Sequence, residues 1–142
     1  LDILALKVLT SLTINTPLFK MLKKRIESFK FAFAGIRHFV SSEPNVAIHL
    51  ITAVLVVFLG FFFSVSTTEW CFLVLAIGAV LSAEAFNTAI EYLTDLVSPD
   101  YHELAGKTKD VAAAAVLIMA ISAAIIGVII FLPKLLDFFN FK

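Results

Sequence analysis

The chain has 142 residues, a formal net charge of zero, 61% hydrophobic residues and a mean hydropathy of +1.00. This length fits a single domain, but the hydropathy is far above that of a soluble one, so the composition predicts a protein with several membrane spans. Its basic residues are too scattered, and the chain too apolar, for nucleic acid to be a partner. The single cysteine, Cys71, excludes an intramolecular disulfide framework.

Residues 1–16 form an N-terminal segment of unclear role, and they lack the basic region and small-residue cleavage site of a signal peptide. Thr16-Pro17 then opens a helix pattern over about residues 17–41. Basic side chains gather on one side of this helix and large apolar ones on the other. The pattern predicts an amphipathic helix that lies on the membrane surface and ends at Ser41-Ser42-Glu43-Pro44.

Three apolar stretches follow, and we expect transmembrane helices over about residues 45–65, 70–97 and 109–132. A helix needs roughly 20 apolar residues to cross the ~30 Å hydrocarbon layer. The first and third stretches meet this condition, whereas the second meets it only if Glu84, Glu91 and Asp95 are counted inside the span. A short turn over residues 63–69 and a polar loop over 98–110 would connect the spans.

The distribution of basic residues predicts the orientation of these helices. Seven of the eleven Lys and Arg residues precede the first span, and Lys107 and Lys109 lie between the second and third. The positive-inside rule therefore places the N-terminus and the second loop in the cytoplasm. Trp70 then lies at the outer edge of the second span, where an interfacial indole is expected.

The second span carries a stripe of polar residues. At helical spacing Glu84, Asn87, Glu91 and Asp95 share one narrow face. A charged group at the centre of a membrane helix costs about 2.5–3.5 kcal/mol, so this face should meet protein or water rather than lipid. At ~1.5 Å per residue Glu84 lies about 21 Å inward of Trp70, which places the stripe in the cytoplasmic half of the span.

The polar groups that converge at this level predict a chemistry. Glu43 should lie at a height similar to that of Glu91, and Lys109 approaches from the following loop. Hard oxygen ligands favour Mg²⁺, and phosphoryl transfer requires positioned phosphates and neutralised charge. Glu43 and Glu91 could hold the metal, Lys109 could meet phosphate, and Glu84 could accept the proton of a lipid hydroxyl. The alternative is that these groups only pair across subunits to fix helix packing.

Three further features are assigned no catalytic part. Gly106-Lys107-Thr108 ends like a P-loop, but the glycine that this motif requires at position 101 is Tyr101. Lys107 is interpreted as a solvated loop charge. His49 is interpreted as a polar contact inside the helix bundle rather than as a metal ligand.

Two adjoining runs carry a resemblance to a known family. They are Glu84-Ala-Phe-Asn87-Thr88-Ala-Ile-Glu91-Tyr-Leu-Thr-Asp95 and Tyr101-His102-Glu103-Leu104-Ala105-Gly106-Lys107-Thr108-Lys109-Asp110. Together they resemble the signature of the bacterial integral-membrane diacylglycerol kinases, a family that also contains the undecaprenol kinases. Ser28-Phe29-Lys30 with Gly35, and Glu43-x-Asn45-x-x-Ile48-His49, are also similar, so the resemblance covers roughly residues 25–132.

The resemblance implies a homotrimer of protomers with one surface helix and three spans, and active sites between neighbouring subunits. It implies Glu84 as general base, and Glu43 and Glu91 as ligands of a metal–ATP complex. Further polar positions of the site would be Asn87, Asp95, Lys109 and Asp110, with Lys109 near phosphates. The nucleotide would also meet Asp100, Tyr101 and His102, and a basic residue of the surface helix, Lys24 or Arg25. Pro44 and Val46-Ala47 depart from the family pattern, and they concern contacts with the lipid substrate more than ATP chemistry.

We therefore expect an all-α membrane protein of the bacterial cytoplasmic membrane, in which residues 17–142 form one lipid-kinase domain that uses ATP with Mg²⁺. Diacylglycerol and undecaprenol both remain open as the lipid acceptor, and the segment from Glu43 to His49 resembles the undecaprenol kinases slightly more. An ion-coupled transporter is a second hypothesis, since intramembrane carboxylates can relay ions. It predicts polar residues through the outer half of the bundle, but residues 71–81 are apolar. An oligomeric membrane scaffold is a third.

Overall fold

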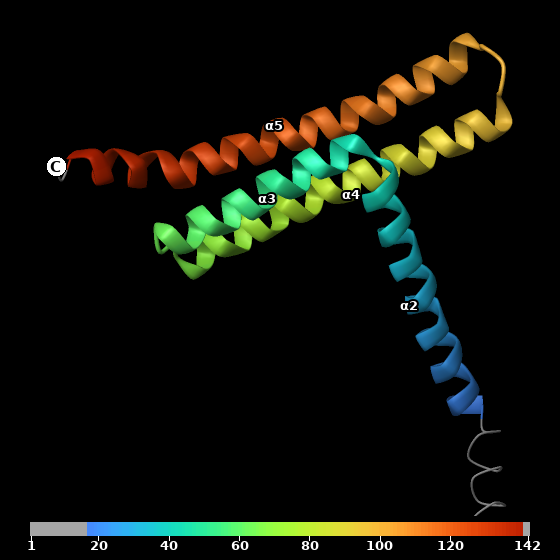
Figure 1. Cartoon of the computed structure of the whole chain (residues 1–142), viewed down its shortest axis with the longest axis horizontal. Coiled ribbons are helices and arrows are strands. Elements are labelled where there is room, and N and C mark those ends of the chain that lie inside the picture. The colour runs from blue at the N-terminus through green and yellow to red at the C-terminus, as the bar shows by residue number, and fades with distance from the viewer. Residues whose placement is uncertain (1–16, 141–142) are drawn as a thin grey trace, which may run out of the picture. The chain divides into compact units, whose positions relative to one another are not determined.

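The computed structural model describes residues 17–140, and in this range the chain is helical apart from short connections (Figure 1). The helices are α2 (Pro17–Ser42), α3 (Pro44–Phe62), α4 (Thr67–Val97) and α5 (Glu103–Asn140). The predicted all-α class is confirmed. The segment of residues 1–16, with its expected lack of a signal peptide, lies outside the described residues.

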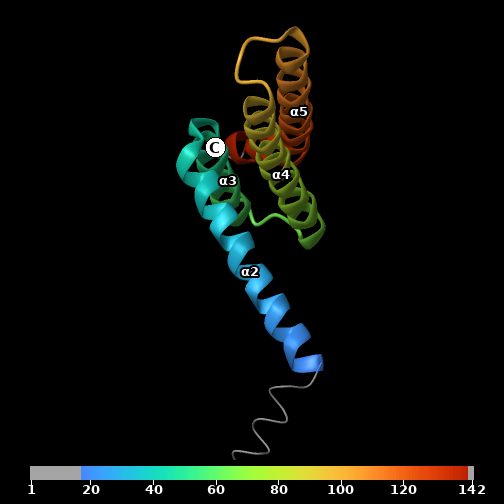
Figure 2. The same cartoon turned by 90° about the vertical axis from the view of Figure 1, so that its right-hand side faces the viewer.

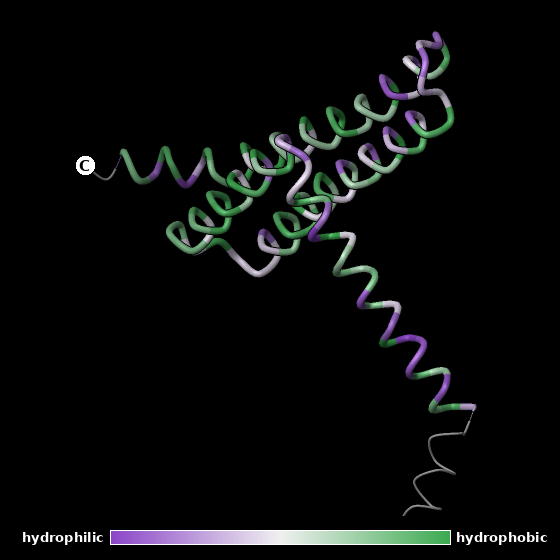
Figure 3. Tube along the Cα trace, turned by 45° about the vertical axis from the view of Figure 1, so that its right-hand side comes forward, coloured by the Kyte–Doolittle hydropathy of each residue, from purple (hydrophilic) through white to green (hydrophobic). Residues whose placement is uncertain are grey.

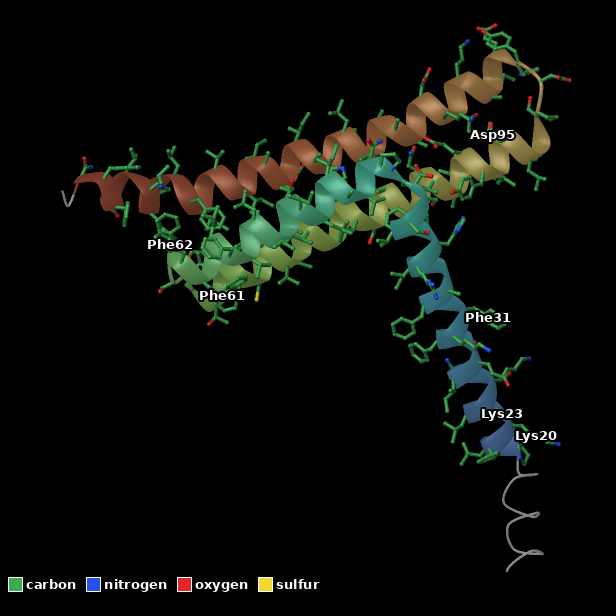
Figure 4. The ribbon with its side chains drawn as sticks, in the orientation of Figure 1. Lys20, Lys23, Phe31, Phe61, Phe62 and Asp95 are labelled. Atoms are coloured by element: carbon green, nitrogen blue, oxygen red, sulfur yellow. The ribbon has the colours of Figure 1, made fainter. Side chains whose placement is uncertain are left out.

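Helix α2, up to Ser41, lies in a compact unit separate from that of the other helices, and none of its residues is buried. Hydrophilic and hydrophobic positions alternate along it (Figure 3), and Lys20, Lys23 and Phe31 project from its surface (Figure 4). The helix ends before Glu43, whose backbone is extended with φ −111° and ψ 114°. The cause is Pro44, because proline pushes the residue before it out of the helical region. That α2 lies on a membrane surface stays a prediction.

The second unit contains α3, α4 and α5, and α4 is its central helix. Helix α4 packs against both α3 and α5, and Figures 1 and 2 show these two helices running beside it. Each of the three is long and apolar enough to cross a membrane. The prediction of three membrane-spanning helices is therefore confirmed, although the end of α3, the start of α4 and both ends of α5 differ from the expected bounds.

Helix α4 begins at Thr67, three residues before the expected start near residue 70. Ser66 forms a capping box with Glu69: the amide of Glu69 donates to Ser66 Oγ at 3.3 Å, and the amide of Ser66 donates to Glu69 Oε2 at 2.6 Å. This exchange satisfies two donors that a helix start otherwise leaves unpaired. The turn between α3 and α4 is therefore residues 63–66, and it includes Ser64 at a positive φ of 50°.

The prediction of a polar loop over residues 98–110 is wrong. Only residues 98–102 are non-helical, and α5 begins at Glu103. A carboxylate in the first turn favours the positive end of the helix dipole. Glu103 also pairs one turn later with Lys107, at 2.5 Å from Nζ to Oε1, so Lys107 is a helix residue rather than a free loop charge. At its other end α5 continues through Pro133 to Asn140, beyond the expected limit of residue 132.

The apolar core of the three-helix unit lies near the 63–66 turn. Val65, Leu73 and Ile130 are buried there, with Val56, Phe63, Trp70, Ile126 and Phe131 packed around them. An ion pair of 3.0 Å between Lys134 Nζ and Glu69 Oε1 joins α5 to the first turn of α4. We call this the turn end of the unit, and the end at residues 98–102 the loop end. Phe61 and Phe62 mark the first and Asp95 the second (Figure 4).

Candidate active site

The polar stripe of α4 runs from a buried position to an exposed one. Glu84 is buried, with 5% of its surface exposed, and Thr88 beside it is equally covered. Asn87 and Glu91 are half-buried, and Asp95 near the loop end is exposed. The four predicted residues therefore form a graded path that leads from the loop end into the helix bundle.

Glu84, at the buried end, contacts His49 of α3. Glu84 Oε1 lies 2.9 Å from His49 Nε2, and the side chains are 6% and 24% exposed, respectively. Both residues line a cavity of about 280 Å³. Asn45 and Asn87 add polar atoms to its wall, while α5 contributes the apolar side chains Ala113, Val116, Leu117 and Ala120. The cavity thus has a carboxylate on one side and an apolar wall on the other.

Asn87 and Glu91, one turn apart on α4, are joined directly. Asn87 Nδ2 donates a hydrogen bond of 2.8 Å to Glu91 Oε1. The other amide atom, Asn87 Oδ1, is buried and has no hydrogen-bond partner within the described part of the chain. Buried acceptors are nearly always satisfied in proteins, so an acceptor left over at this place can receive a bound molecule or water.

Glu43, in the extended link between α2 and α3, is held by a tyrosine of α4. The Tyr92 hydroxyl lies 3.3 Å from Glu43 Oε1 and 3.1 Å from the hydroxyl of Ser42. Because Tyr92 directly follows Glu91, this contact fixes Glu43 at the level of α4 that carries Glu91. This contact explains why Glu43 lies at a height similar to that of Glu91, as the sequence predicts.

Asp95 and Lys109 connect α4 to α5 near the loop end. Lys109 Nζ lies 2.5 Å from Asp95 Oδ1. The carboxylate of Asp95 thus orients the ammonium group of Lys109, although solvent screens the pair because its side chains are 62% and 36% exposed, respectively. Asp110, the next residue of α5, is exposed.

Residues 98–102 contain the predicted nucleotide contacts Asp100, Tyr101 and His102. Ser98 Oγ donates to the backbone oxygen of Asp100 at 3.2 Å, and Tyr101 is 94% exposed. His102 Nδ1 accepts a hydrogen bond of 3.2 Å from the amide of Leu104, so this ring also caps the start of α5. His102 borders a groove of about 490 Å³ between α4 and α5, lined further by Leu93, Thr94, Val97, Ser98, Leu104, Ala105 and Thr108.

Two further predictions concern Lys24 and Val46. Lys24 is exposed on α2, which forms part of the other unit, so its contact with a nucleotide stays a prediction. Val46, a departure from the family pattern that we linked to lipid contacts, has none of its surface exposed. It is a core residue of the three-helix unit, and only the neighbouring Ala47 is exposed there.

The donor set fits a magnesium ion with phosphates. Among residues 17–140 no three His, Cys, Asp or Glu side chains come together in a way that could hold a metal by themselves. Mg²⁺ does not require such a cage, because it is usually bound by one or two carboxylates together with substrate phosphates and water. Glu43 and Glu91 can supply those carboxylates, since each uses Oε1 in the hydrogen bonds above and a carboxylate has about four acceptor sites.

Two residues of the site were not assigned to it from the sequence. The first, His49, was interpreted only as a polar contact, although its spacing of four from Asn45 places both on one face of α3. The second, Tyr92, borders the α4 stripe at helical spacing, and the sequence analysis gives it no role. In both cases the partner lies on another segment.

Comparison with known proteins identifies the family. The family model described as prokaryotic diacylglycerol kinase matches residues 30–131. The chain belongs to this family. Undecaprenol kinase of Bacillus subtilis is 41% identical over 114 residues, which are 80% of this chain and 93% of that protein. Diacylglycerol kinase of a Synechocystis species is 39% identical over 111 residues, 78% of this chain and 63% of the relative. Diacylglycerol kinase of Escherichia coli K12 is 30% identical over 100 residues, which are 70% of this chain and 82% of that protein.

This member of the prokaryotic diacylglycerol kinase family is therefore a lipid kinase, and a kinase requires a nucleotide phosphate donor. Its three apolar helices and its bacterial relatives make it a bacterial membrane protein. The transporter and scaffold hypotheses are not favoured.

Proposed function

We propose that this protein transfers the γ-phosphoryl group of ATP to the hydroxyl group of undecaprenol, at the cytoplasmic surface of the bacterial inner membrane. The observation that carries the proposal is the placement of Glu84. Its carboxylate is buried beside a cavity with an apolar wall, at the inner end of a polar path that opens at the loop end. A lipid alcohol and a water-soluble nucleotide can reach such a position from two different sides.

Glu84 is the general base of this proposal. Its carboxylate takes the proton of the lipid hydroxyl while the hydroxyl oxygen forms a bond to the γ-phosphorus, the bond from that phosphorus to the bridging oxygen breaks, and ADP leaves. A positioned base contributes typically 10²- to 10⁴-fold to such a step. Mg²⁺ held by Glu43 and Glu91 would neutralise phosphate charge, which phosphoryl transfer requires.

The remaining polar residues bind and orient the nucleotide. Lys109 meets a phosphate group, and Asp95 keeps its ammonium in place at 2.5 Å. Asp100, Tyr101 and His102 contact the nucleotide beside the groove at the loop end, and Asp110 and Lys24 complete the polar surroundings. Asn87 offers its unsatisfied Oδ1 and fixes Glu91 through Nδ2.

Undecaprenol is chosen over diacylglycerol on two grounds. The Bacillus subtilis undecaprenol kinase is covered over 93% of its length by the match, against 63% for the Synechocystis diacylglycerol kinase. The segment from Glu43 to His49 also resembles the undecaprenol kinases more. The percentages of identity, 41% and 39%, do not separate the two acceptors.

The proposed setting follows from charge and surface. Seven of the eleven Lys and Arg residues precede α3, which supports a cytoplasmic N-terminus. The large apolar surface of the three-helix unit supports self-association in the membrane, and the resemblance implies a trimer.

The test is transfer of label from γ-³²P-ATP by the purified protein in mixed micelles, with undecaprenol and diacylglycerol offered separately at equal mole fraction. We expect label in undecaprenyl phosphate, Mg²⁺ dependence, and no lipid product when the acceptor is omitted. Label in phosphatidate instead would make diacylglycerol the acceptor. No label in either lipid, from folded protein, would contradict the proposal.

A further inference from the structure

His49 is the side chain closest to the proposed general base that has no part in the proposed reaction. It comes from α3, whereas Glu84 comes from α4, so the contact of 2.9 Å is a joint between two helices. Both side chains line the same cavity of about 280 Å³. An imidazole at this place therefore touches the carboxylate directly at the point where an acceptor hydroxyl would enter.

The cavity wall formed by the described residues contains no other charged residue that could compete with Glu84 for the His49 ring. The other polar residues there, Asn45 and Asn87, are uncharged amides. The wall contributed by α5 is formed by alanine, valine and leucine side chains. Among the residues that line the cavity, Glu84 is thus the one charged group for His49 to bond.

A metal-binding role for His49 has no support in the structure. The metal of the proposed reaction is Mg²⁺, which prefers oxygen ligands to the nitrogen of an imidazole. A packing role alone would not require the polar atom of the ring to meet the carboxylate.

We propose that His49 is a positioning residue for Glu84. Through an N–H group at Nε2, it donates a hydrogen bond to Glu84 Oε1 and holds the carboxylate in one orientation, so that Oε2 is left for the acceptor hydroxyl. A carboxylate on a flexible glutamate side chain has several rotamers, and a base fixed in the productive one reacts faster. This inference rests on the proposed lipid-kinase function and adds to it a residue that acts through the base.

The proposal predicts a specific division between kinetic constants. Replacing the donor by an apolar group, His49→Leu, should lower kcat about tenfold or more, because the hydrogen bond to the carboxylate is lost. The KM for ATP should stay within about twofold of the wild-type value, because the ring contacts the base and not the predicted nucleotide residues. His49→Gln keeps an N–H donor, and its kcat should recover to within about threefold of wild type.

The experiment measures kcat and KM in mixed micelles for the full chain, its His49→Leu and His49→Gln variants, and the control Thr52→Val. Thr52 is a matched control because it lies less than one turn further along α3, and its hydroxyl donates to the backbone oxygen of Ile48 at 2.9 Å. Thr52→Val should behave as wild type. If His49→Leu does not fold, as judged by its thermal midpoint, His49→Asn takes its place, because the shorter amide is withdrawn from Glu84.

The outcomes separate this inference from the proposed function. An inactive wild-type protein would contradict the lipid-kinase proposal itself. With an active wild type, an unchanged kcat in His49→Leu would overturn the positioning role. An equal loss of kcat in His49→Leu and His49→Gln would also overturn it, because the N–H donor would then not be the property that matters. A change confined to the KM for ATP would overturn it as well. A kcat that falls in His49→Leu and recovers in His49→Gln would support the inference.

Discussion

At the residue scale, each charged side chain of the α4 stripe has a partner that fixes it. Glu84 meets His49 of α3, and Asp95 meets Lys109 of α5, at 2.9 and 2.5 Å, respectively. Glu91 is bonded by Asn87 of the same helix. Charged groups are costly inside a membrane unless they are paired, so these contacts explain how the stripe of this apolar helix can carry three carboxylates. They also hold the carboxylates in fixed positions, which a catalytic site requires.

The contact between Tyr92 and Glu43 gives a testable prediction about nucleotide binding. Tyr92→Phe removes the hydroxyl that lies 3.3 Å from Glu43 Oε1 and leaves the ring in place. A hydrogen bond to a charged group contributes about 1.5–3 kcal/mol, so the KM for Mg²⁺-ATP should rise about tenfold or more while kcat changes less than about twofold. Steady-state kinetics at saturating lipid would measure both constants.

Ser42→Ala serves as the companion variant. Ser42 is the other hydroxyl within hydrogen-bond distance of Tyr92, at 3.1 Å, but it is not a proposed metal ligand. This change should alter the KM for Mg²⁺-ATP less than Tyr92→Phe does. An unchanged KM in Tyr92→Phe would show that the tyrosine does not position Glu43 for the nucleotide.

The stripe itself could be predicted from the sequence, but its partners could not. The positions of Glu84, Asn87, Glu91 and Asp95 on one face depend only on the helical period. The pairing of Glu84 with His49 depends on how far α3 is shifted along α4, and no single helix contains that information. The spacing of Asn45 and His49 could have indicated a polar face on α3, but not what that face meets.

At the element scale, the helix types were predictable and their ends were less so. Apolar length was enough to indicate three spans. The start of α4 at Thr67 could have been found from Ser66-x-x-Glu69, a capping-box pattern. The start of α5 at Glu103 was obscured because residues 103–110 are polar, and polarity in an exposed helix turn resembles that of a loop. The extent of α5 past Pro133 depends on packing and the Lys134–Glu69 pair at the turn end.

Packing at the turn end gives a second prediction. A Cβ atom added at Gly60 of α3 would lie 2.6 Å from Cη2 of the Trp70 indole, whereas one added at Gly127 of α5 would meet nothing within 4 Å. Gly60→Ala should therefore displace the indole and destabilise the protein by about 1–3 kcal/mol. Thermal unfolding in detergent would show a lowered midpoint for Gly60→Ala.

Gly127→Ala is the matched control, since it makes the same change in an apolar helix with free space around it. Its midpoint should equal that of the wild type or exceed it, because alanine favours the helix more than glycine does. Equal midpoints for both variants would mean that the contact between Gly60 and Trp70 does not hold α3 against α4.

At the scale of the whole molecule, one copy of the chain buries little of its apolar surface. The apolar windows of α3, α4 and α5 are only 11%, 28% and 6% buried, so most of their side chains must face lipid or other copies. Glu84, by contrast, is already covered within a single chain. Self-association is therefore not needed to bury this carboxylate, and any oligomer must be stabilised by other surfaces.

We expect a homotrimer in the membrane, with the apolar surfaces of α3 and α5 partly covered by neighbouring copies. Chemical cross-linking in native membranes, followed by mass determination of the solubilised protein, should give products up to three protomers. Glu84→Ala should assemble in the same way, because this residue is covered inside its own chain. A monomer in membranes, or a variant that loses assembly together with activity, would contradict this expectation.

The most direct test of the central claim concerns Glu84 as the base of lipid phosphorylation. The measurement is single-turnover transfer of label from γ-³²P-ATP to undecaprenol by wild-type protein and by Glu84→Gln, with ATP binding determined for both. Glutamine keeps the shape but is a poor base, so we predict loss of transfer by about 10²-fold or more with nearly unchanged ATP affinity. Transfer by Glu84→Gln at the wild-type rate would contradict the claim.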